Sequence, residues 1–471
     1  MTCSKWINDF IEQTKDKWTK TSDYIWDHPE LRYEEYESAK YLSHILERKG
    51  FTVTRGIANI ETAFVGEFGS GGPVIAFLGE YDALSNLSQK SGIAKQEPIV
   101  DQGNGHGCGH NLLGTGALAA AVTLKTYLEK NNIKGIVRFY GCPAEEGGSG
   151  KTFMAREGVF DDVDVALTWH PGSVNAIWSF STLANVQAYF KFTGRSAHAA
   201  NAPHLGRSAL DAVELMNSGV NYLREHIIPE ARVHYAVTDT GGISPNVVQA
   251  NAEVLYLIRA PQVDETMSIY ERVKKIAEGA ALMTETEVEV VFDKAASNFI
   301  PNTTLNKTME KAMQQLGAPQ FTAEEFAFAE EIQQTLSKEE LAAKNLGMKM
   351  LDFAVAKPLS DVNIPFFETS QIMSGSTDVG DVSWVTPTAQ CIGATAATGT
   401  AFHTWQMTAQ GKTSYAHKGM LHVAKVLSLT AIYLLEDKTL IEKAKVEHTE
   451  KVGTGGYQCP IPDFIKPNQM G

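Results

Sequence analysis

The chain has 471 residues, of which 43% are hydrophobic and 20% are charged, as in an ordinary folded protein. This length is too great for one small core and predicts two domains, or one domain inserted into another. The formal net charge is -14, and Lys and Arg form no dense cluster that could follow a phosphate backbone. The composition excludes a fibrous or disordered chain and argues against nucleic acid as a partner.

Two apolar stretches resemble export or membrane segments in part, but both have the pattern of packed helices. Residues 1–20 carry Trp6 and Phe10 among many charges, which is typical of an amphipathic helix rather than a signal peptide. Residues 421–435 contain His422 and Lys425 and are too short to span a membrane. We therefore expect a protein that crosses no membrane and stays in the cytoplasm.

The cysteines are few and widely scattered, namely Cys3, Cys108, Cys142, Cys391 and Cys459. Their odd number and wide spacing argue against a disulfide framework. A cysteine with a special role is therefore expected to be a metal ligand or a nucleophile.

In the first 170 residues, apolar runs rich in branched side chains alternate with helical patterns. Residues 74–78, 136–140 and 163–168 each predict a buried strand, and residues 113–129 have the Ala and Leu content of a buried helix. This alternation predicts an α/β fold with a central sheet covered by helices. Such sheets bind their ligands in the loops at the strand ends.

A different sheet is predicted to begin near residue 184, where apolar and polar side chains alternate. Its elements are strand 185–192, helix 209–226, strands 232–238 and 248–258, helix 265–283 and strand 287–292. This is the βαββαβ order of a ferredoxin-like unit. We therefore predict a catalytic domain made of residues 1–183 and 296–471, interrupted by a smaller inserted domain of residues 184–295.

The densest motif is Gly105-His106-Gly107-Cys108-Gly109-His110-Asn111. Glycines leave this segment free to bend, and in a turn the two-residue spacing lets the thiolate of Cys108 and the imidazole of His110 face one cation. Taken alone, the motif is better explained as a flexible loop with a buried cysteine. Its context must therefore decide.

A second motif, Pro143-Ala144-Glu145-Glu146-Gly147-Gly148, directly follows a predicted buried strand. Adjacent residues point in different directions, so one carboxylate can bind a metal while its neighbour accepts a proton from the attacking water. A solvated acidic turn is the alternative.

Two further histidines stand at candidate ligand positions. His170 ends an apolar strand in Trp169-His170-Pro171, and His403 lies in a Gly- and Thr-rich segment. A single histidine of this kind is more often a hydrogen-bonded structural residue. Together, however, Cys108, His110, Glu146, His170 and His403 form a set large enough to hold two metal ions that share a ligand.

These motifs and their order resemble the two-metal peptidases and amidohydrolases that include aminoacylase, succinyl-diaminopimelate desuccinylase and the auxin-conjugate hydrolases. The thiol-containing branch of that family has a Cys-Gly-His motif, a Glu-Glu pair after a strand, a His about two dozen residues later and a distal His. Within it, residues 79–84, 107–111 and 376–381 are most similar to the B-type subunits of aminobenzoyl-glutamate hydrolases. Asn111 and Ser85 replace an Asp and a Pro of the auxin-conjugate hydrolases.

The resemblance implies roles for the first domain. Cys108 would bridge two divalent ions, Zn or Mn, with His110 and His170 completing one site, and with Glu146 and His403 completing the other. Glu145 would be the general base. Asp82 would orient a ligand, and Glu80 stands where relatives have a metal-binding His.

The resemblance also implies that the inserted domain serves as a lid and in dimer formation. His198 and Asn246 would hold the scissile carbonyl, and Arg259 would hold the substrate carboxylate, which suits its planar fork of donors. His198 would reach the site of a partner chain in a homodimer, and a related subunit is the other partner considered.

The expected activity is hydrolysis of an N-acyl or aryl-amide amino-acid conjugate such as p-aminobenzoyl-glutamate. A dipeptidase, an N-deacetylase and a non-catalytic partner subunit are the alternatives.

Overall fold

The computed structural model describes residues 2–341 and 357–468, and the chain divides into two compact units. Unit 1 is formed by Met1–Phe180, Ile300–Gln371 and Val382–Tyr457, and unit 2 by Ser181–Phe299, Ile372–Asp381 and Gln458–Gly471. The predicted inserted segment, residues 184–295, lies within unit 2. The predicted second catalytic segment, residues 296–471, is divided between the units. The predicted domain boundaries, 1–183, 184–295 and 296–471, stay a prediction.

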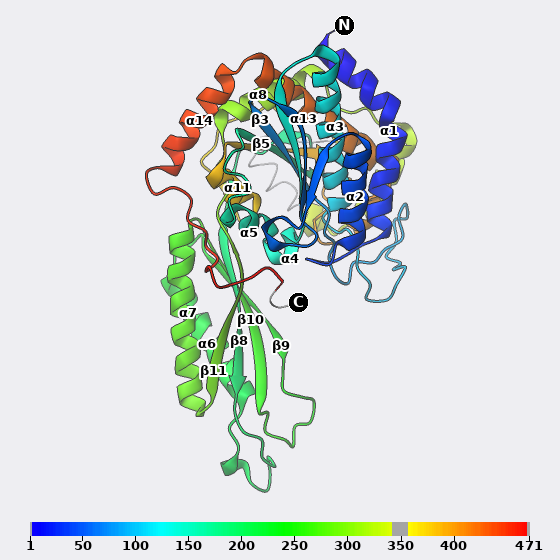
Figure 1. The fold of residues 1–471 in the computed structure, drawn as a ribbon. Helices are drawn as coiled ribbons and strands as arrows, with labels where there is room; N and C mark the ends of the chain where they lie inside the picture. The colour runs from blue at the N-terminus through cyan, green and yellow to red at the C-terminus, as the bar shows by residue number, and fades with distance from the viewer. Residues whose placement is uncertain (1, 342–356, 469–471) are drawn as a thin grey trace. The chain divides into compact units, whose positions relative to one another are not determined.

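Unit 1 is an α/β structure, which confirms the predicted fold class (Figure 1). Its strands are β1 (Thr52–Arg55), β2 (Phe64–Ser70), β3 (Val74–Glu80), β4 (Gly135–Cys142), β5 (Val165–Gly172), β6 (Ala176–Ile177) and β13 (Thr388–Ala394). Its helices are α1 (Cys3–Asp27), α2 (Tyr36–Arg48), α3 (His110–Asn131), α4 (Glu145–Gly148), α5 (Gly150–Arg156), α8 (Thr303–Leu316), α9 (Ala323–Gln334), α12 (Trp405–Gln410), α13 (Ser414–Glu436) and α14 (Thr439–Val452); η1 (Ile57–Asn59) is a short 3-10 helix, and α11 (Val379–Val385) spans the boundary between the units.

The seven strands form one mixed sheet in the order β1-β2-β4-β3-β5-β13-β6. Its four central strands, β4, β3, β5 and β13, run parallel to one another, while the outer strands are antiparallel to their neighbours. The central strands carry buried branched and aromatic side chains because helices cover them. Parallel pairing brings the carboxyl ends of these strands, and the loops that follow them, to one edge of the sheet.

The main helical layer consists of α1, α3 and α13. Helix α3 packs on β3, β4 and β5, and α13 and α1 pack on α3. Helix α13 is long and apolar enough to pass a length-and-composition test for a membrane span, but most of its surface is buried in unit 1. Its apolar character is therefore explained by the core, as the sequence predicted.

Unit 2 contains β7 (Ser181–Thr182), β8 (Ala184–Thr193), η2 (Pro203–Leu205), α6 (Ala209–Leu223), η3 (Arg224–His226), β9 (Arg232–Asp239), β10 (Asn251–Ala260), α7 (Val263–Thr284), β11 (Glu287–Ala296) and β12 (Ile372–Met373). The predicted βαββαβ order is confirmed. Strands β8 to β11 form an antiparallel sheet in the order β11-β8-β10-β9, and α6 and α7 pack on it, while β7 and β12 form a separate parallel pair. Alternate residues of β10, from Ala252 to Ile258, face this packed layer and are buried.

Strand β9 is the outer strand of the unit 2 sheet, and seven of its eight residues are exposed. Tyr235 and Val237 are apolar side chains among them, and Ile243 in the following loop is 99% exposed. An outer strand of this length leaves backbone donors and acceptors available for a further strand.

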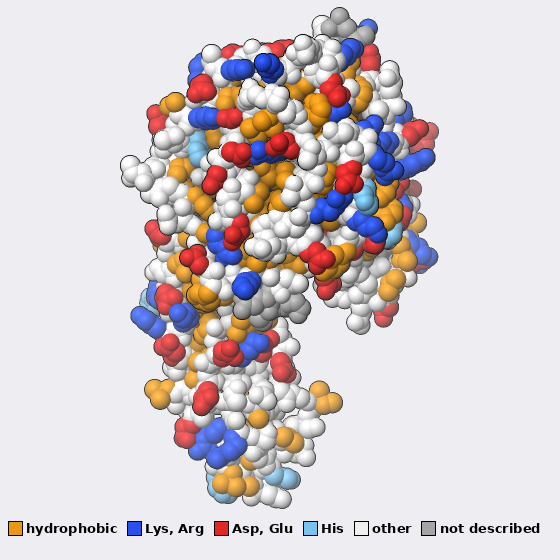
Figure 2. Space-filling model, viewed as in Figure 1, with side chains coloured by type: hydrophobic (Ala, Val, Ile, Leu, Met, Phe, Trp, Pro, Cys, Tyr) orange, Lys and Arg blue, Asp and Glu red, His pale blue; other side chains and the backbone are white. Residues whose placement is uncertain are grey.

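The surface carries charges of both signs. On the face drawn in Figure 2, acidic and basic side chains are interspersed over both units. All five cysteines are free thiols, and Cys108, Cys142 and Cys391 are buried.

Candidate metal and catalytic site

Cys108 and His110 lie in a tight turn that leads directly into α3. Gly109 adopts a left-handed backbone conformation (φ 79°), and a Cβ there would lie 3.0 Å from the Pro171 side chain. A Cβ on Gly107 would lie 2.4 Å from Leu87. The glycines are therefore needed for the bend and for close packing, as the motif predicted.

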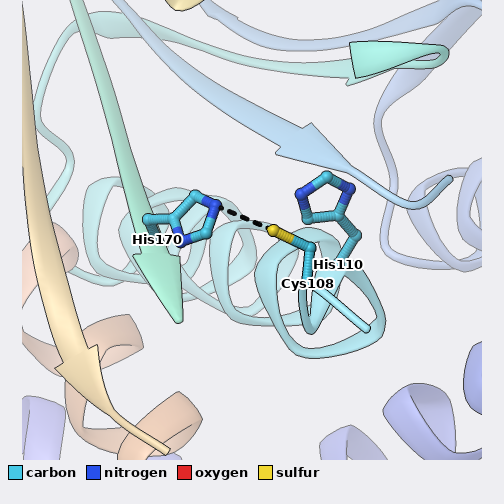
Figure 3. Close-up of side chains that lie close together, drawn as sticks. All are labelled: Cys108, His110 and His170. Carbon is cyan, nitrogen blue, oxygen red and sulfur yellow. Dashed lines mark hydrogen bonds between the residues drawn. The ribbon is translucent and has the colours of Figure 1, made fainter. Parts of the chain in front are cut away.

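His110 is buried and His170 is half-buried, and one ring nitrogen of each is fixed by a hydrogen bond. His110 Nδ1 donates to Asp82 Oδ1 at 2.8 Å, and His170 Nδ1 donates to the Pro171 carbonyl at 2.7 Å. Burial lowers the pKa of His110, but the charges of Asp82 and Cys108 outweigh it and raise this pKa well above its ordinary value. A metal ion would bind the neutral rings, in which the proton is on Nδ1 and Nε2 carries a lone pair. Figure 3 shows the Cys108 sulfur between the two rings, with Sγ 3.5 Å from His170 Nε2.

The second group around Cys108 contains Glu146 and His403. His403 Nε2 lies 3.1 Å from Glu146 Oε1, and the His403 backbone N–H donates to the Gly107 carbonyl at 2.9 Å. The loop after β13 is thereby joined to the cysteine turn. Candidate ligand atoms of Cys108, Glu146 and His403 all lie within 4.8 Å of one another, as do those of Cys108, His110 and His170.

These spacings fit bound metal. With Zn–N and Zn–O bonds of about 2.0–2.2 Å and Zn–S bonds of about 2.3 Å, ligand atoms of one tetrahedral ion are roughly 3.3–3.6 Å apart. The Cys108–His170 distance of 3.5 Å lies in that range, and the Glu146–His403 distance of 3.1 Å is slightly shorter. His110 Nε2 is buried and forms no hydrogen bond within the described residues. A cation would satisfy that atom.

Asp82 links the two groups through its two carboxylate oxygens. One oxygen accepts from His110, and the other accepts from the Glu146 backbone N–H at 2.8 Å. Asp82 is 1% exposed. A single buried carboxylate therefore fixes the ring of one candidate ligand and the backbone of another.

The local electrostatics oppose a free thiolate. Burial, followed by the nearby Glu146 carboxylate, raises the pKa of the Cys108 thiol well above its ordinary value. Burial also raises the pKa of Glu146, but the hydrogen bond from His403 and the charge of His110 outweigh it and lower the pKa to about 2. The site thus favours the carboxylate unaided, whereas a thiolate requires a cation beside it.

The segment between α1 and α2 supports the Glu145–Glu146 turn, although it carries no motif that predicts this role. Glu35 Oε1 accepts from the Ala144 N–H at 2.8 Å, Tyr33 donates to the Gly148 carbonyl at 2.6 Å, and Arg32 donates to the Gly147 carbonyl. Burial, followed by the charge of Asp82, raises the pKa of Glu35 well above its ordinary value. No local pattern predicts these contacts, because they join residues more than one hundred positions apart.

His106 and Asp381 belong to the motifs that carry the family resemblance, but each makes contacts that hold the fold rather than the candidate ligands. His106 Nε2 contacts the Ile25 carbonyl at 3.0 Å, and burial lowers the pKa of this histidine to about 4. Asp381, from the 376–381 motif, accepts from the backbone N–H and the hydroxyl of Ser297.

The candidate substrate residues lie in unit 2. His198 Nδ1 accepts from the backbone N–H groups of Ala200 and Asn201, both at 3.2 Å, which leaves the proton of a neutral ring on Nε2. The Ala199 N–H donates to the Asn246 carbonyl at 3.0 Å, so the loops of His198 and Asn246 are joined. Both residues are exposed.

Arg259 lies on the sheet face of unit 2 that α6 and α7 leave free, opposite Asn185 on β8. It has no ion-pair partner within the described residues, and its Nε and the Asn185 Oδ1 are buried without hydrogen bonds. Burial lowers the pKa of the Arg259 guanidinium. Arg259 is half-buried, and a partly desolvated cation without a partner is costly, so this face is suited to bind an anion.

Comparisons with known proteins identify the family of the chain. The family model "Peptidase family M20/M25/M40" matches residues 76–347. The chain is 53% identical to the B-type subunit of the p-aminobenzoyl-glutamate hydrolase of Escherichia coli (strain K12), covering 99% of each chain. It is 29% identical to the Xaa-Arg dipeptidase of Mus musculus, covering 93% of this chain and 90% of the relative.

Among solved structures, a dinuclear metal-binding peptidase of the M20 family from Bacillus subtilis superposes with a TM-score of 0.56 at 18% identity, over 90% of this chain and 99% of that one. That likeness shows the fold, and the full-length identity and the family match show the ancestry. The predicted family is confirmed: the chain belongs to the peptidase family M20/M25/M40.

Proposed function

We propose that the chain is a metal-dependent amidohydrolase that cleaves the amide bond of an N-acyl or aryl-amide amino-acid conjugate, with p-aminobenzoyl-glutamate as the leading substrate. The main support is that five candidate ligands lie close together at the carboxyl edge of the unit 1 sheet, namely Cys108, His110, His170, Glu146 and His403. The substrate class is taken from the relative that is 53% identical over the whole chain.

The proposed metal centre holds two divalent ions. Cys108 is common to both groups of candidate ligands, so it is the proposed bridge. Thiolate favours zinc, whereas carboxylate and imidazole also suit manganese, so the native ion is either Zn or Mn. Bound ions would polarise the amide carbonyl and lower the pKa of a water molecule.

Glu145 is the proposed general base. It is half-buried, and its carboxylate lies within 4.8 Å of candidate ligand atoms of His110 and Glu80. It would take one proton from the attacking water and deliver it to the leaving amine nitrogen as the C–N bond breaks. The products are then a carboxylic acid and a free amino acid.

In unit 2, His198 and Arg259 have the chemistry to bind the substrate. The Nε2–H of His198 can donate to the oxyanion, with Asn246 beside it, and the guanidinium of Arg259 can pair with a carboxylate. As the family resemblance implies, His198 would act in the site of a partner chain of a homodimer. The exposed edge of β9 supports a partner of some kind, and the 53%-identical relative is itself named as one subunit of a hydrolase, which keeps a related second subunit as an alternative.

A dipeptidase is the second candidate function, because a 29%-identical relative is an Xaa-Arg dipeptidase. N-deacetylation and a non-catalytic subunit role follow behind it. A cytoplasmic location is also part of the proposal. The mostly buried helix α13 is compatible with it.

The test is a substrate panel with metal-free chain reloaded separately with Zn²⁺ or Mn²⁺. It contains p-aminobenzoyl-glutamate, an N-acetyl amino acid and dipeptides ending in Arg. We expect release of equal amounts of p-aminobenzoate and glutamate. Cleavage of the dipeptides alone would establish the dipeptidase, and no turnover by a chain that binds two ions would favour a non-catalytic subunit.

A further inference from the structure

A carboxylate that takes no part in the proposed chemistry is buried behind the Glu145–Glu146 turn. Glu35 immediately precedes α2 and is 0% exposed. Its Oε1 accepts from the Ala144 N–H at 2.8 Å, and its Oε2 accepts from the Thr62 hydroxyl at 3.0 Å. The Thr62 carbonyl in turn accepts from the Tyr81 hydroxyl at 2.6 Å, directly after β3. Glu35 thus ties the residue before Glu145 to the central sheet.

The residue that Glu35 holds has an unfavourable backbone conformation. Ala144 is left-handed, with φ 61° and ψ 35°. A Cβ is crowded in this region, so an alanine adopts it only where its surroundings impose it. Ser149, at the other end of α4, is left-handed as well (φ 55°). The short helix that carries both glutamates therefore lies between two strained residues, and contacts from outside must fix it.

Two buried carboxylates hold the start of this turn. Glu35 accepts the Ala144 N–H, and Asp82 accepts the Glu146 N–H at 2.8 Å. Asp82 also accepts from the candidate ligand His110. The side-chain hydrogen bonds of Glu35 join it instead to Ala144 and Thr62, and neither is a candidate ligand. The effect of Glu35 on the turn can therefore be separated from effects on metal binding.

We propose that Glu35 is a positioning residue for the general base: by holding the Ala144 N–H, it imposes the left-handed conformation that aims the Glu145 carboxylate. This inference rests on the proposed role of Glu145. Any other conformation of Ala144 would redirect the chain one residue before Glu145. Moving a reacting group by about 1 Å can slow a reaction by roughly 100-fold. The task needs an acceptor oxygen on Glu35 and no negative charge.

The experiment compares Glu35→Gln with Glu35→Met in the metal-loaded protein, with p-aminobenzoyl-glutamate as substrate. Gln keeps an oxygen for the Ala144 N–H, and its amide can donate to the Thr62 hydroxyl, whereas Met has a similar size and no oxygen. We expect kcat within about threefold of the wild type for Glu35→Gln, and a loss of roughly 10- to 100-fold for Glu35→Met. Both variants should hold two ions, and KM should change little.

A second substitution tests the backbone conformation itself. Gly adopts the left-handed region without a steric cost, whereas Ala is disfavoured there by roughly 5- to 30-fold. In the Ala144→Gly background, the loss of kcat caused by Glu35→Met should therefore be at least about fivefold smaller. A packing role of Glu35 alone would give the same loss in both backgrounds.

Thr62→Val provides a milder variant if Glu35→Met does not fold. It removes the hydroxyl that donates to Glu35 Oε2 and keeps the shape of the side chain. We expect it to lower kcat roughly 2- to 10-fold, as for one lost hydrogen bond, with both ions retained. An unchanged kcat in folded Thr62→Val would count against the inference.

Glu325 supplies the matched control. It is 7% exposed and accepts from the Thr322 N–H at 2.7 Å and from the Ser414 hydroxyl at 2.6 Å, so its donors are of the same kinds as those of Glu35. It also pairs with Lys418, and these contacts join α9 to α13. Glu325→Met should unfold at a lower urea concentration, but the folded protein should keep the wild-type kcat.

The possible results separate this inference from the proposed function. The inference is overturned if Glu35→Met keeps the wild-type kcat, or if Glu35→Gln is as slow as Glu35→Met. Loss of metal from folded Glu35→Met would also overturn it, because Glu35 would then support the ligands rather than Glu145. If the wild type binds two ions and cleaves no amide of the substrate panel, the proposed function itself is wrong.

Discussion

The candidate ligands of unit 1 and the candidate substrate residues of unit 2 are held in opposite ways. His110 is completely buried, and its ring is fixed by the buried carboxylate of Asp82. His198 is exposed, and its ring is held by two backbone N–H groups of its own loop. Packing within one chain is thus enough to fix the candidate ligand His110, whereas the candidate substrate residue His198 is open to solvent.

The largest expected effect comes from the Glu145–Glu146 turn. Glu145→Gln should keep both metal ions and slow turnover roughly 100- to 10,000-fold, because the general base is lost. Glu146→Gln should instead lose metal, because its carboxylate lies beside His403 in the ligand group. Elemental analysis and turnover, measured together, separate the two roles, and the reverse pair of phenotypes would exchange them.

Arg259 provides the corresponding test in unit 2. Arg259→Met should weaken kcat/KM roughly 10- to 150-fold for substrates with a free α-carboxylate, since a hydrogen bond to a charged group contributes about 1.5–3 kcal/mol. The matching α-carboxamides should lose much less. Equal losses on both substrate types would make Arg259 a structural residue of β10.

The burial of His422 in unit 1 also predicts that the free energy of unfolding depends on pH. Burial, followed by the charge of Lys425, lowers the pKa of His422 in α13 to about 3. Below an unfolded pKa of about 6.5 the unfolded chain binds a proton that the folded chain does not, so stability falls as the pH falls from 6.5 towards 3. Relative to His422→Leu, the wild type should lose about 2 kcal/mol of unfolding free energy between pH 6.5 and pH 5.

Urea unfolding of the metal-free proteins measures this difference without interference from metal release. The control is the same pair of proteins between pH 8 and pH 9, where both states are almost fully unprotonated and the curves should run parallel. Parallel curves down to pH 5 as well would mean that His422 is protonated in the folded chain.

The smallest expected effect comes from an experiment that tests whether His198 of unit 2 acts in the active site of a partner chain. Glu145→Ala and His198→Ala are mixed under conditions that allow subunit exchange. If His198 acts in the site of its partner, each hybrid dimer contains one intact site, and random exchange restores about one quarter of wild-type activity. If His198 acts in its own chain, every site carries one lesion. Exchange confirmed by mass measurement without recovery of activity would therefore remove the shared site.

Much of the fold could be predicted because the signals are local. The branched runs at β3, β4 and β5 and the alternating strands β8 and β10 have the right types, and most of their predicted ends lie within a few residues of those observed. The Cys-Gly-His turn, the Glu-Glu pair and the two later histidines could also be singled out, because each stands in a glycine-rich segment or close to a strand end. Local patterns show which residues can bind a metal, but not which of them meet.

Tertiary structure alone decided the rest. Parallel pairing of β4, β3, β5 and β13 gathers loops from residues 80 to 403 at one edge, and it is this pairing that gives Cys108 two groups of neighbours. The supports from Arg32, Tyr33 and Glu35 and the Glu80–Lys151 pair had no signature in the chain. A charged residue in a sequence is expected to be exposed to solvent, because only the folded chain shows whether a partner of opposite charge compensates its burial.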